Sequence, residues 1–232
     1  MGRSFGYCGH CEKEVLDDML YTCTYCRHST CCSPQEWGCE EYYDYTEKNN
    51  GKEKEGFCIW LTGLSGSGKT TISNELICRY PGLEGYWIPR VHQLDGDIAR
   101  QTFSKDLGYD EASRNENVVR AASVASYLVK QGDVIISAFM SPYREGREFA
   151  RSIIPNFFEV YVDCSLEVCI ERDPKDLYKL RREGKIEHMV GMDSSYETSD
   201  SPELVVDTSA HDVGYTVIEI MQCLQEKEFL PW

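Results

Sequence analysis

The sequence lacks a hydrophobic run long enough to cross a membrane. Its longest apolar runs, such as residues 134–140, are far shorter than the roughly 20 residues that a transmembrane helix needs. No apolar segment follows Arg3 as it would in a secretory signal peptide. Gly6 stands where a myristoylation signal has Ser or Thr. We therefore expect a cytoplasmic protein with no membrane partner.

Basic residues are also scarce. The 232-residue chain has 24 Lys and Arg against 39 Asp and Glu, which gives a formal net charge of −15 at pH 7. Because an acidic surface repels nucleic acid, we expect no nucleic-acid partner. Nucleotides are anions too, so a phosphate site in this chain needs locally concentrated positive charge. Hydrophobic residues make up 41% of the chain, enough for one α/β domain with a small appendage.

Cysteine is unevenly distributed, with seven of the twelve residues in the first 39 positions. Two C-x-x-C pairs are formed by Cys8, Cys11, Cys23 and Cys26. This spacing is typical of structural zinc, which can supply folding energy to a segment without a core; a redox disulfide pair is the alternative. We expect residues 1–45 to be a zinc module that binds a protein partner or a second copy. Residues 46–56 read as a polar linker, and residues 57–232 as the main domain.

Strand-like and helix-like patterns alternate from residue 57 onward. Buried or short strands are predicted at residues 57–63, 92–96, 133–139, 157–163 and 204–207. Helices are predicted at residues 69–80, 112–130, 144–153, 166–172 and 216–226. Fully apolar strands that alternate with helices predict a parallel sheet covered on both faces, which is a three-layer α/β fold.

Residues 63–70 match the Walker A pattern G-x-x-x-x-G-K-[ST] and lie between a predicted strand and a predicted helix. Glycines let successive backbone N–H groups point at phosphate oxygens, and the helix that follows adds its dipole. Lys69 would contact the β- and γ-phosphates, and the Thr70 hydroxyl would ligate Mg²⁺. We expect ATP to be bound by Gly63, Leu64, Ser65, Gly66, Ser67, Gly68, Lys69, Thr70 and Thr71.

Asp95 and Asp97 follow at the end of the next predicted strand, where side chains lie over the ligand crevice of a parallel sheet. Asp95 would accept the proton of an acceptor hydroxyl, and Asp97 would help to order Mg²⁺ or its waters. A turn with a helix cap is the alternative interpretation. Arg100 and Arg114 would attract an anionic acceptor, unless they belong to a solvated charged face.

Two further segments would complete the crevice. Residues 140–144 follow the second buried strand and therefore reach the same edge of the sheet. A basic stretch over residues 172–185 would close over the phosphates as a cationic flap and exclude water. An ordinary solvated helix is the alternative for this stretch.

Taken together, residues 56–208 resemble the adenylylsulfate kinase (APS kinase) family of P-loop kinases. The resemblance rests on dispersed motifs in order: WLTGLSGSGKTT (60–71), LDGD (94–97) with Arg100, DLGY (106–109), RNEN (114–117), SPYR (141–144), RDPKDLY (172–178), GMDSSYE (191–197) and DT (207–208). It implies a phosphotransferase that moves the ATP γ-phosphoryl group to the 3′-hydroxyl of adenosine 5′-phosphosulfate (APS). The products would be ADP and 3′-phosphoadenosine 5′-phosphosulfate (PAPS), for sulfate assimilation or for sulfation.

The resemblance also implies roles for individual residues. The catalytic set would be Lys69, Asp95, Asp97 and Ser141, and Arg172 would join the ATP site. The acceptor would be bound by Arg100, Tyr109, Arg114, Asn117, Met140, Ser141, Pro142 and Met189. The family's serine at position 141 is traditionally described as a phosphoserine intermediate. Direct in-line transfer suffices, so we expect Ser141 to hydrogen-bond the acceptor instead.

Three positions depart from the family pattern. Met189 stands where the family has a Phe that stacks on the acceptor adenine, Ile98 replaces an Asn, and Asp176 replaces a Gly in the flap. These departures keep open a kinase of the same fold that acts on another nucleotide-like or phosphorylated acceptor. A nucleotide-binding regulatory protein that acts through the zinc module is a further alternative. For the enzyme we expect a homodimer.

Overall fold

The computed structural model describes residues 5–7, 14–16, 56–79 and 90–229. At the N-terminus, β1 (Phe5–Tyr7) pairs antiparallel with β2 (Glu14–Leu16). The predicted zinc ligands Cys8, Cys11, Cys23 and Cys26 lie outside the described residues. Their zinc site therefore stays a prediction.

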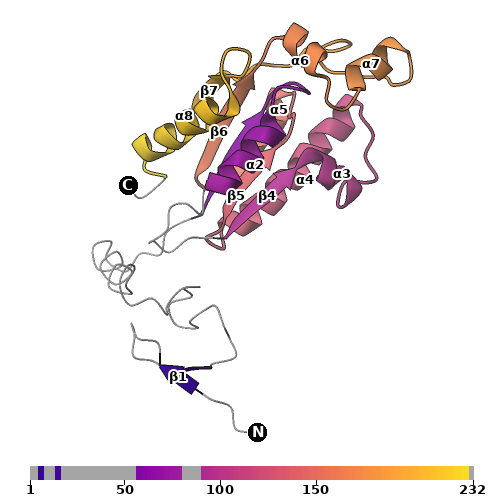
Figure 1. Ribbon diagram of the computed structural model, residues 1–232. Helices are drawn as coiled ribbons and strands as arrows, with labels where there is room; N and C mark the ends of the chain where they lie inside the picture. Colours follow the sequence, from indigo (N-terminus) through magenta and orange to yellow (C-terminus); the bar gives the residue numbers. More distant parts are fainter. Residues whose placement is uncertain (1–4, 8–13, 17–55, 80–89, 230–232) are drawn as a thin grey trace. The chain divides into compact units, whose positions relative to one another are not determined.

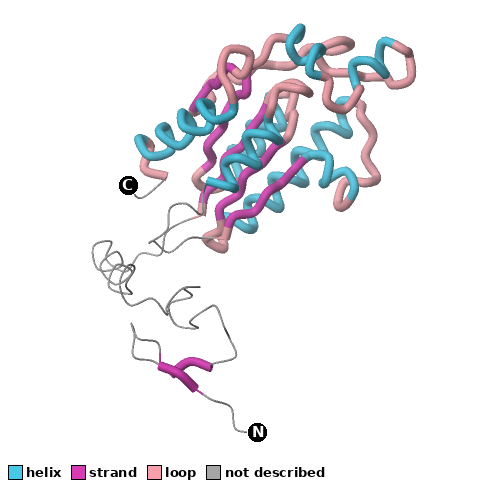
Figure 2. Tube along the Cα trace, viewed as in Figure 1, coloured by secondary structure: helices cyan, strands magenta, loops and turns pink. Residues whose placement is uncertain are grey.

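The main domain contains a five-stranded sheet (Figures 1 and 2). Its strands are β3 (Phe57–Thr62), β4 (Val91–Asp95), β5 (Val134–Ala138), β6 (Phe157–Asp163) and β7 (Leu204–Asp207). Their order across the sheet is β4-β5-β3-β6-β7, and every neighbouring pair is parallel. The predicted parallel α/β sheet is thus confirmed, with β3 at its centre.

Helices cover both faces of this sheet. The helices of the domain are α2 (Lys69–Arg79), α3 (Gly96–Gln101), α4 (Glu111–Val129), α5 (Arg144–Ile153), α6 (Leu166–Arg172), α7 (Leu177–Arg182) and α8 (Val213–Glu226). One face of the sheet is covered by α2 and α8 and the other by α3, α4 and α5, whereas α6 and α7 pack in a separate cluster. Successive side chains of a strand point to opposite faces. On β3, Ile59 and Leu61 therefore pack in one core with α2 and α8, whereas Cys58 and Trp60 pack in the other with α4 and α5.

Most predicted element bounds agree with the structure to within a few residues, and the exceptions have local causes. Helices α3 and α7 have six residues each, too few to show a hydrophobic period, and they were expected only as the alternatives of a helix cap at Asp95 and a solvated helix in the basic stretch. Helix α8 begins three residues earlier than predicted because the Asp212 side chain accepts a hydrogen bond from the Tyr215 N–H at 2.8 Å. Within the described ranges, no helix is long and apolar enough to cross a membrane.

Candidate active site

The phosphate loop joins the carboxyl end of the central strand β3 to the start of α2. Gly66 and Gly68 have φ angles of +81° and +98°, which L-residues with side chains rarely adopt. A Cβ atom added to Gly66 would lie 2.9 Å from the Cys169 carbonyl oxygen of α6. Close packing against α6 therefore adds a second reason for glycine at this position.

Lys69, the first residue of α2, folds back over its own loop. Its Nζ donates to the Leu64 carbonyl oxygen at 2.6 Å and to the Ser67 Oγ at 3.3 Å. Burial, followed by the like charge of Lys175, lowers the pKa of Lys69 to about 8. The phosphate loop thus holds a buried cation, and a bound anion would further stabilise its charged form.

Thr70 and Asp95 form a pair of oxygen ligands beside this cation. The Thr70 hydroxyl donates to Asp95 Oδ2 at 2.9 Å, and Asp95 Oδ1 accepts from the Asp97 N–H at 2.8 Å as the N-cap of α3. Asp95 therefore caps a helix and also lines the crevice, so the two interpretations do not exclude each other, and its role as a proton acceptor stays a prediction. Hard oxygen ligands of this kind suit Mg²⁺, which takes few protein ligands and keeps waters or phosphates for the rest. The described residues contain no cluster of three or more His, Cys, Asp or Glu side chains able to hold a metal.

Asp97 forms an ion pair with Lys175, which comes from the basic stretch after α6. Arg172 and Lys175 of this stretch line the cleft, whereas Lys179, Arg181 and Lys185 pair with Asp176, Asp193 and Glu183. The stretch therefore presents two cations to the site. Lys175 was predicted only as part of the flap, because its partner Asp97 lies 78 residues away in the sequence.

Two arginines gather around Tyr109, at the end of the cleft that we call the acceptor end because the sequence predicts acceptor binding there. The Arg100 guanidinium lies 4.4 Å and that of Arg114 5.6 Å from the centre of the Tyr109 ring. Arg100 also donates to the Gly108 carbonyl at 2.6 Å, and Arg114 donates to the Tyr109 carbonyl at 2.7 Å. Two guanidinium groups around one ring give this end the local positive charge that the acidic chain needs. Burial lowers the pKa of both groups, so an anion bound between them would stabilise their charged forms.

The floor and walls of the same end come from three other segments. Asn117 on α4 is buried, and its Oδ1 has no protein partner. Arg114 contacts the Met140 sulfur at 3.9 Å and donates to the His188 carbonyl at 2.9 Å. Met189 is only 3% exposed and packs with Tyr178 and other residues of α6 and α7. Met189 lines the cleft, but most of its side-chain surface is buried against its neighbours.

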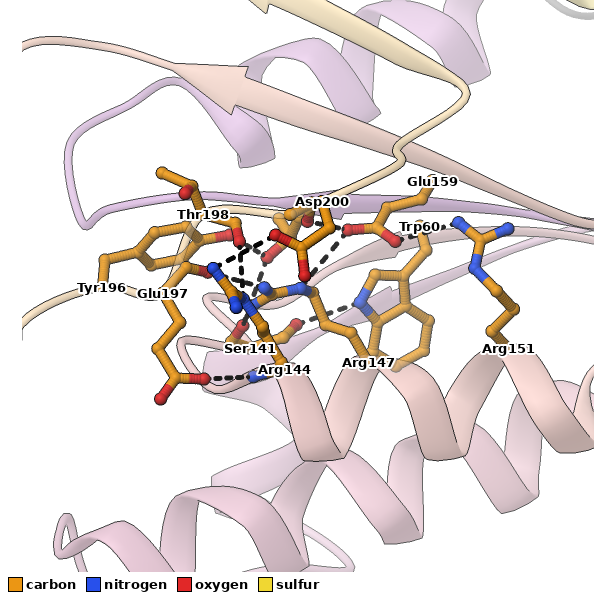
Figure 3. Close-up of polar contacts among 12 residues, drawn as sticks. Trp60, Ser141, Arg144, Arg147, Arg151, Glu159, Tyr196, Glu197, Thr198 and Asp200 are labelled. Atoms are coloured by element: carbon orange, nitrogen blue, oxygen red, sulfur yellow. Dashed lines mark hydrogen bonds and ion pairs between the residues drawn. The ribbon is translucent and has the colours of Figure 1, made fainter.

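Ser141 adopts a φ angle of +42°, a strained conformation that costs of the order of 1–2 kcal/mol. Its hydroxyl accepts from Trp60 Nε1 at 3.0 Å (Figure 3). The same hydroxyl donates to the Phe139 carbonyl at 3.4 Å. The residue is 2% exposed. Protein partners thus occupy the hydroxyl, which argues against Ser141 as a nucleophile.

Arg172 closes the opposite end of the cleft. Its Nη1 reaches the Gly66 carbonyl and the Thr208 hydroxyl, both at 3.4 Å, and its Nη2 donates to the Thr208 carbonyl at 2.5 Å. Thr208 in turn donates from its hydroxyl to the Ser67 carbonyl at 2.8 Å. Thr208 belongs to the DT motif but had no predicted role. His211 also lines the cleft and was not predicted to do so.

Most of the predicted site residues surround one cleft with a volume of about 1130 Å³. Its lining includes the predicted residues Ser65, Gly66, Gly68, Lys69, Thr70, Thr71, Asp95, Asp97, Arg100, Tyr109, Arg114, Asn117, Met140, Ser141, Pro142, Arg172 and Met189. Of the departures from the family pattern, Ile98 lines the cleft and is 57% exposed, whereas Asp176 does not line it. Gly63, Leu64 and Ser67 shape the loop without lining the cleft.

A phosphate loop after the central strand of a parallel sheet, with a cationic pocket beside it, defines the class of P-loop kinase folds. The sequence model of the family described as "Adenylylsulphate kinase" matches residues 55–207. An adenylyl-sulfate kinase of Bacillus licheniformis is 47% identical over 186 residues, 79% of this chain and 91% of that protein. One of Bacillus pumilus is 48% identical over 167 residues, 71% of this chain and 81% of that protein.

The solved structures agree with this assignment. The APS kinase CysC of Mycobacterium tuberculosis, in complex with AMPPNP and APS, is 35% identical with a TM-score of 0.68. That match covers 75% of this chain and 99% of the other. The protein APE1195 is 37% identical with a TM-score of 0.67, over 75% of this chain and 97% of the other. The chain belongs to the adenylylsulphate kinase family.

Proposed function

We propose that this protein transfers the γ-phosphoryl group of ATP to the 3′-hydroxyl of APS, giving PAPS and ADP. The observation that carries the proposal is a single cleft with a phosphate loop at one end and paired arginines at the other, in a member of the adenylylsulphate kinase family. An APS molecule carries its negative charge on a phosphosulfate, which Arg100 and Arg114 are suited to neutralise.

The residues between the two ends of the cleft have different roles in phosphoryl transfer. Lys69 turns from the Leu64 carbonyl to the β- and γ-phosphates, where the anions restore its full charge. Asp95, which lines the cleft beside Thr70, would accept the proton of the attacking hydroxyl. Thr70 and Asp95 are the residues that would hold Mg²⁺, which supplies charge neutralisation of the β- and γ-phosphates when bound. Lys175, now paired with Asp97, adds a cation from the flap.

ADP release and PAPS formation, measured with purified protein, ATP, Mg²⁺ and APS, test the proposal. Lys69→Ala serves as the control and should lose nearly all turnover. No turnover on APS by the wild-type protein would refute the proposal. Turnover on another nucleotide-like or phosphorylated acceptor would select the alternative kinase, and ATP binding without any turnover would favour a regulatory protein.

We further propose that Cys8, Cys11, Cys23 and Cys26 bind a structural zinc ion in an N-terminal module, on the strength of their spacing. One zinc ion per chain, lost in the double variant Cys8→Ser with Cys23→Ser, is the expected metal content. Zinc that survives both substitutions would rule out this ligand set. The homodimer stays a prediction, which sedimentation of the full chain with and without zinc would test.

A further inference from the structure

Arg147 is a buried cation directly behind the acceptor wall, which we define as residues 140–142. It lies on α5, its side chain is 3% exposed, and the proposed reaction does not use it. A buried guanidinium loses the hydration of its charge, and the loss is tolerable only where its N–H groups find partners. Its partners therefore indicate what it holds in place.

Each part of the Arg147 fork contacts a different segment (Figure 3). Nη1 donates to the Ser141 carbonyl at 2.6 Å, and Nη2 donates to the Glu197 carbonyl at 2.5 Å. Nε lies 3.3 Å from Glu159 Oε1 on β6. The side chain thus joins the acceptor wall, the segment after the flap and the central sheet.

The acceptor wall needs such support because of its backbone. Ser141 has the disfavoured φ angle of +42°, which persists only where surrounding contacts enforce it. Thr62 provides a second contact to the acceptor wall, because its hydroxyl donates to the Met140 carbonyl at 2.7 Å. The conformation at Ser141 in turn sets the direction of Met140, whose sulfur contacts Arg114.

We propose that Arg147 is a positioning residue for the acceptor, and that it acts by holding the Ser141 carbonyl and thereby the acceptor wall. The inference rests on the proposed function, because it takes residues 140–142 as the side of the cleft that meets APS. It predicts a selective effect on the acceptor, since none of the partners of Arg147 belongs to the phosphate loop.

Arg151 offers a matched control one helical turn further along α5. It pairs with the same carboxylate, Glu159, at 3.0 Å, and with Glu203 at 2.6 Å, but its bonds do not include either carbonyl that Arg147 holds. Lysine at position 147 keeps the charge but cannot reproduce the fork. Two variants of Arg147 are useful, Arg147→Lys and Arg147→Met. In both, the Glu159 carboxylate keeps Arg151 as its counter-charge and is not left unpaired.

Steady-state kinetics of the wild type, Arg147→Lys and Arg151→Lys test the inference. Arg147→Lys should raise the KM for APS about tenfold or more, because charge-assisted hydrogen bonds are lost, and leave the KM for ATP within about twofold. Arg151→Lys should leave both constants within about twofold. An unchanged KM for APS in Arg147→Lys, or an equal rise in Arg151→Lys, would overturn the inference. Arg147→Met repeats the test if the lysine variant does not fold.

Amide hydrogen exchange supplies a measurement that does not depend on the substrate. The Gly63 and Glu197 N–H groups donate to the Met140 and Pro142 carbonyls, at 3.3 and 2.9 Å, and therefore report on the acceptor wall. Their exchange should accelerate in Arg147→Lys but not in Arg151→Lys, and equal exchange in the two variants would overturn the inference. Absence of APS turnover by the wild type would instead refute the proposed function, while the exchange result still decides whether Arg147 holds the wall.

Discussion

ATP binding should weaken as the pH rises through the pKa of Lys69. Burial and the nearby Lys175 lower that pKa from 10.5 to about 8 in the nucleotide-free protein. The free protein therefore loses the Lys69 proton near pH 8. Bound phosphates stabilise the charged form and raise the pKa again, so binding at alkaline pH must take up a proton.

The size of the effect follows from the shift. With a pKa near 8, about one in ten free molecules lacks the proton at pH 7, and about nine in ten lack it at pH 9. If the pKa in the complex lies above this range, the Kd for ATP rises about tenfold between these two values. At pH 8 about half a proton should be taken up for each nucleotide bound.

Calorimetric titration with a non-hydrolysable ATP analogue, in buffers of different ionisation enthalpy, measures both quantities. Lys69→Arg is the control, because a guanidinium stays charged throughout and should remove the pH dependence. Lys175→Met removes a like charge and should move the break in the profile to higher pH. A constant Kd from pH 7 to 9 without proton uptake would refute the reasoning, and so would an unchanged profile in Lys69→Arg.

Three other substitutions test other parts of the site. Asp95→Asn should lower kcat for ADP release about 10²-fold, because it removes the proposed proton acceptor, with a smaller change in the KM for ATP. Arg114→Ala should raise the KM for APS about tenfold or more and spare that for ATP; equal rises in both would contradict its assignment to the acceptor end. Gly66→Ala should lose more unfolding free energy in urea than Gly184→Ala. Both glycines have positive φ, but only at Gly66 does the new Cβ meet a backbone oxygen, that of Cys169.

The phosphate loop illustrates what local sequence can predict. Glycine at positions 63, 66 and 68 is needed because each φ angle is positive, and this requirement lies within a few residues of chain. Strand β6 and helices α5 and α6 have the predicted bounds because apolar patterning is local too, and the Ser165 cap adds a local signal for α6. Helices α3 and α7 were expected only as alternatives, because six residues show no hydrophobic period that distinguishes a helix from a turn or a solvated loop.

Contacts between distant segments could not be predicted in the same way. The resemblance implies that Met189 covers the acceptor. The structure adds that this side chain is buried and packs in a cluster with Tyr178. Ser141 was expected to bond the acceptor, which stays a prediction, and the structure adds that its hydroxyl accepts a hydrogen bond from Trp60, 81 residues away. The Trp60 partner could not be inferred from the neighbouring sequence, because Trp60 lies on β3 whereas Ser141 follows β5.

The sequence by itself determined the class of fold, the phosphate loop and the family, because these depend on periodicity and on motifs within short stretches. The tertiary structure alone decided that Lys175 pairs with Asp97, that Thr208 closes on the phosphate loop, and that Arg147 holds the acceptor wall. These pairs form because the parallel order of the sheet brings the carboxyl ends of its strands to one edge. At this edge, residues that are far apart in the sequence come within contact distance of one another.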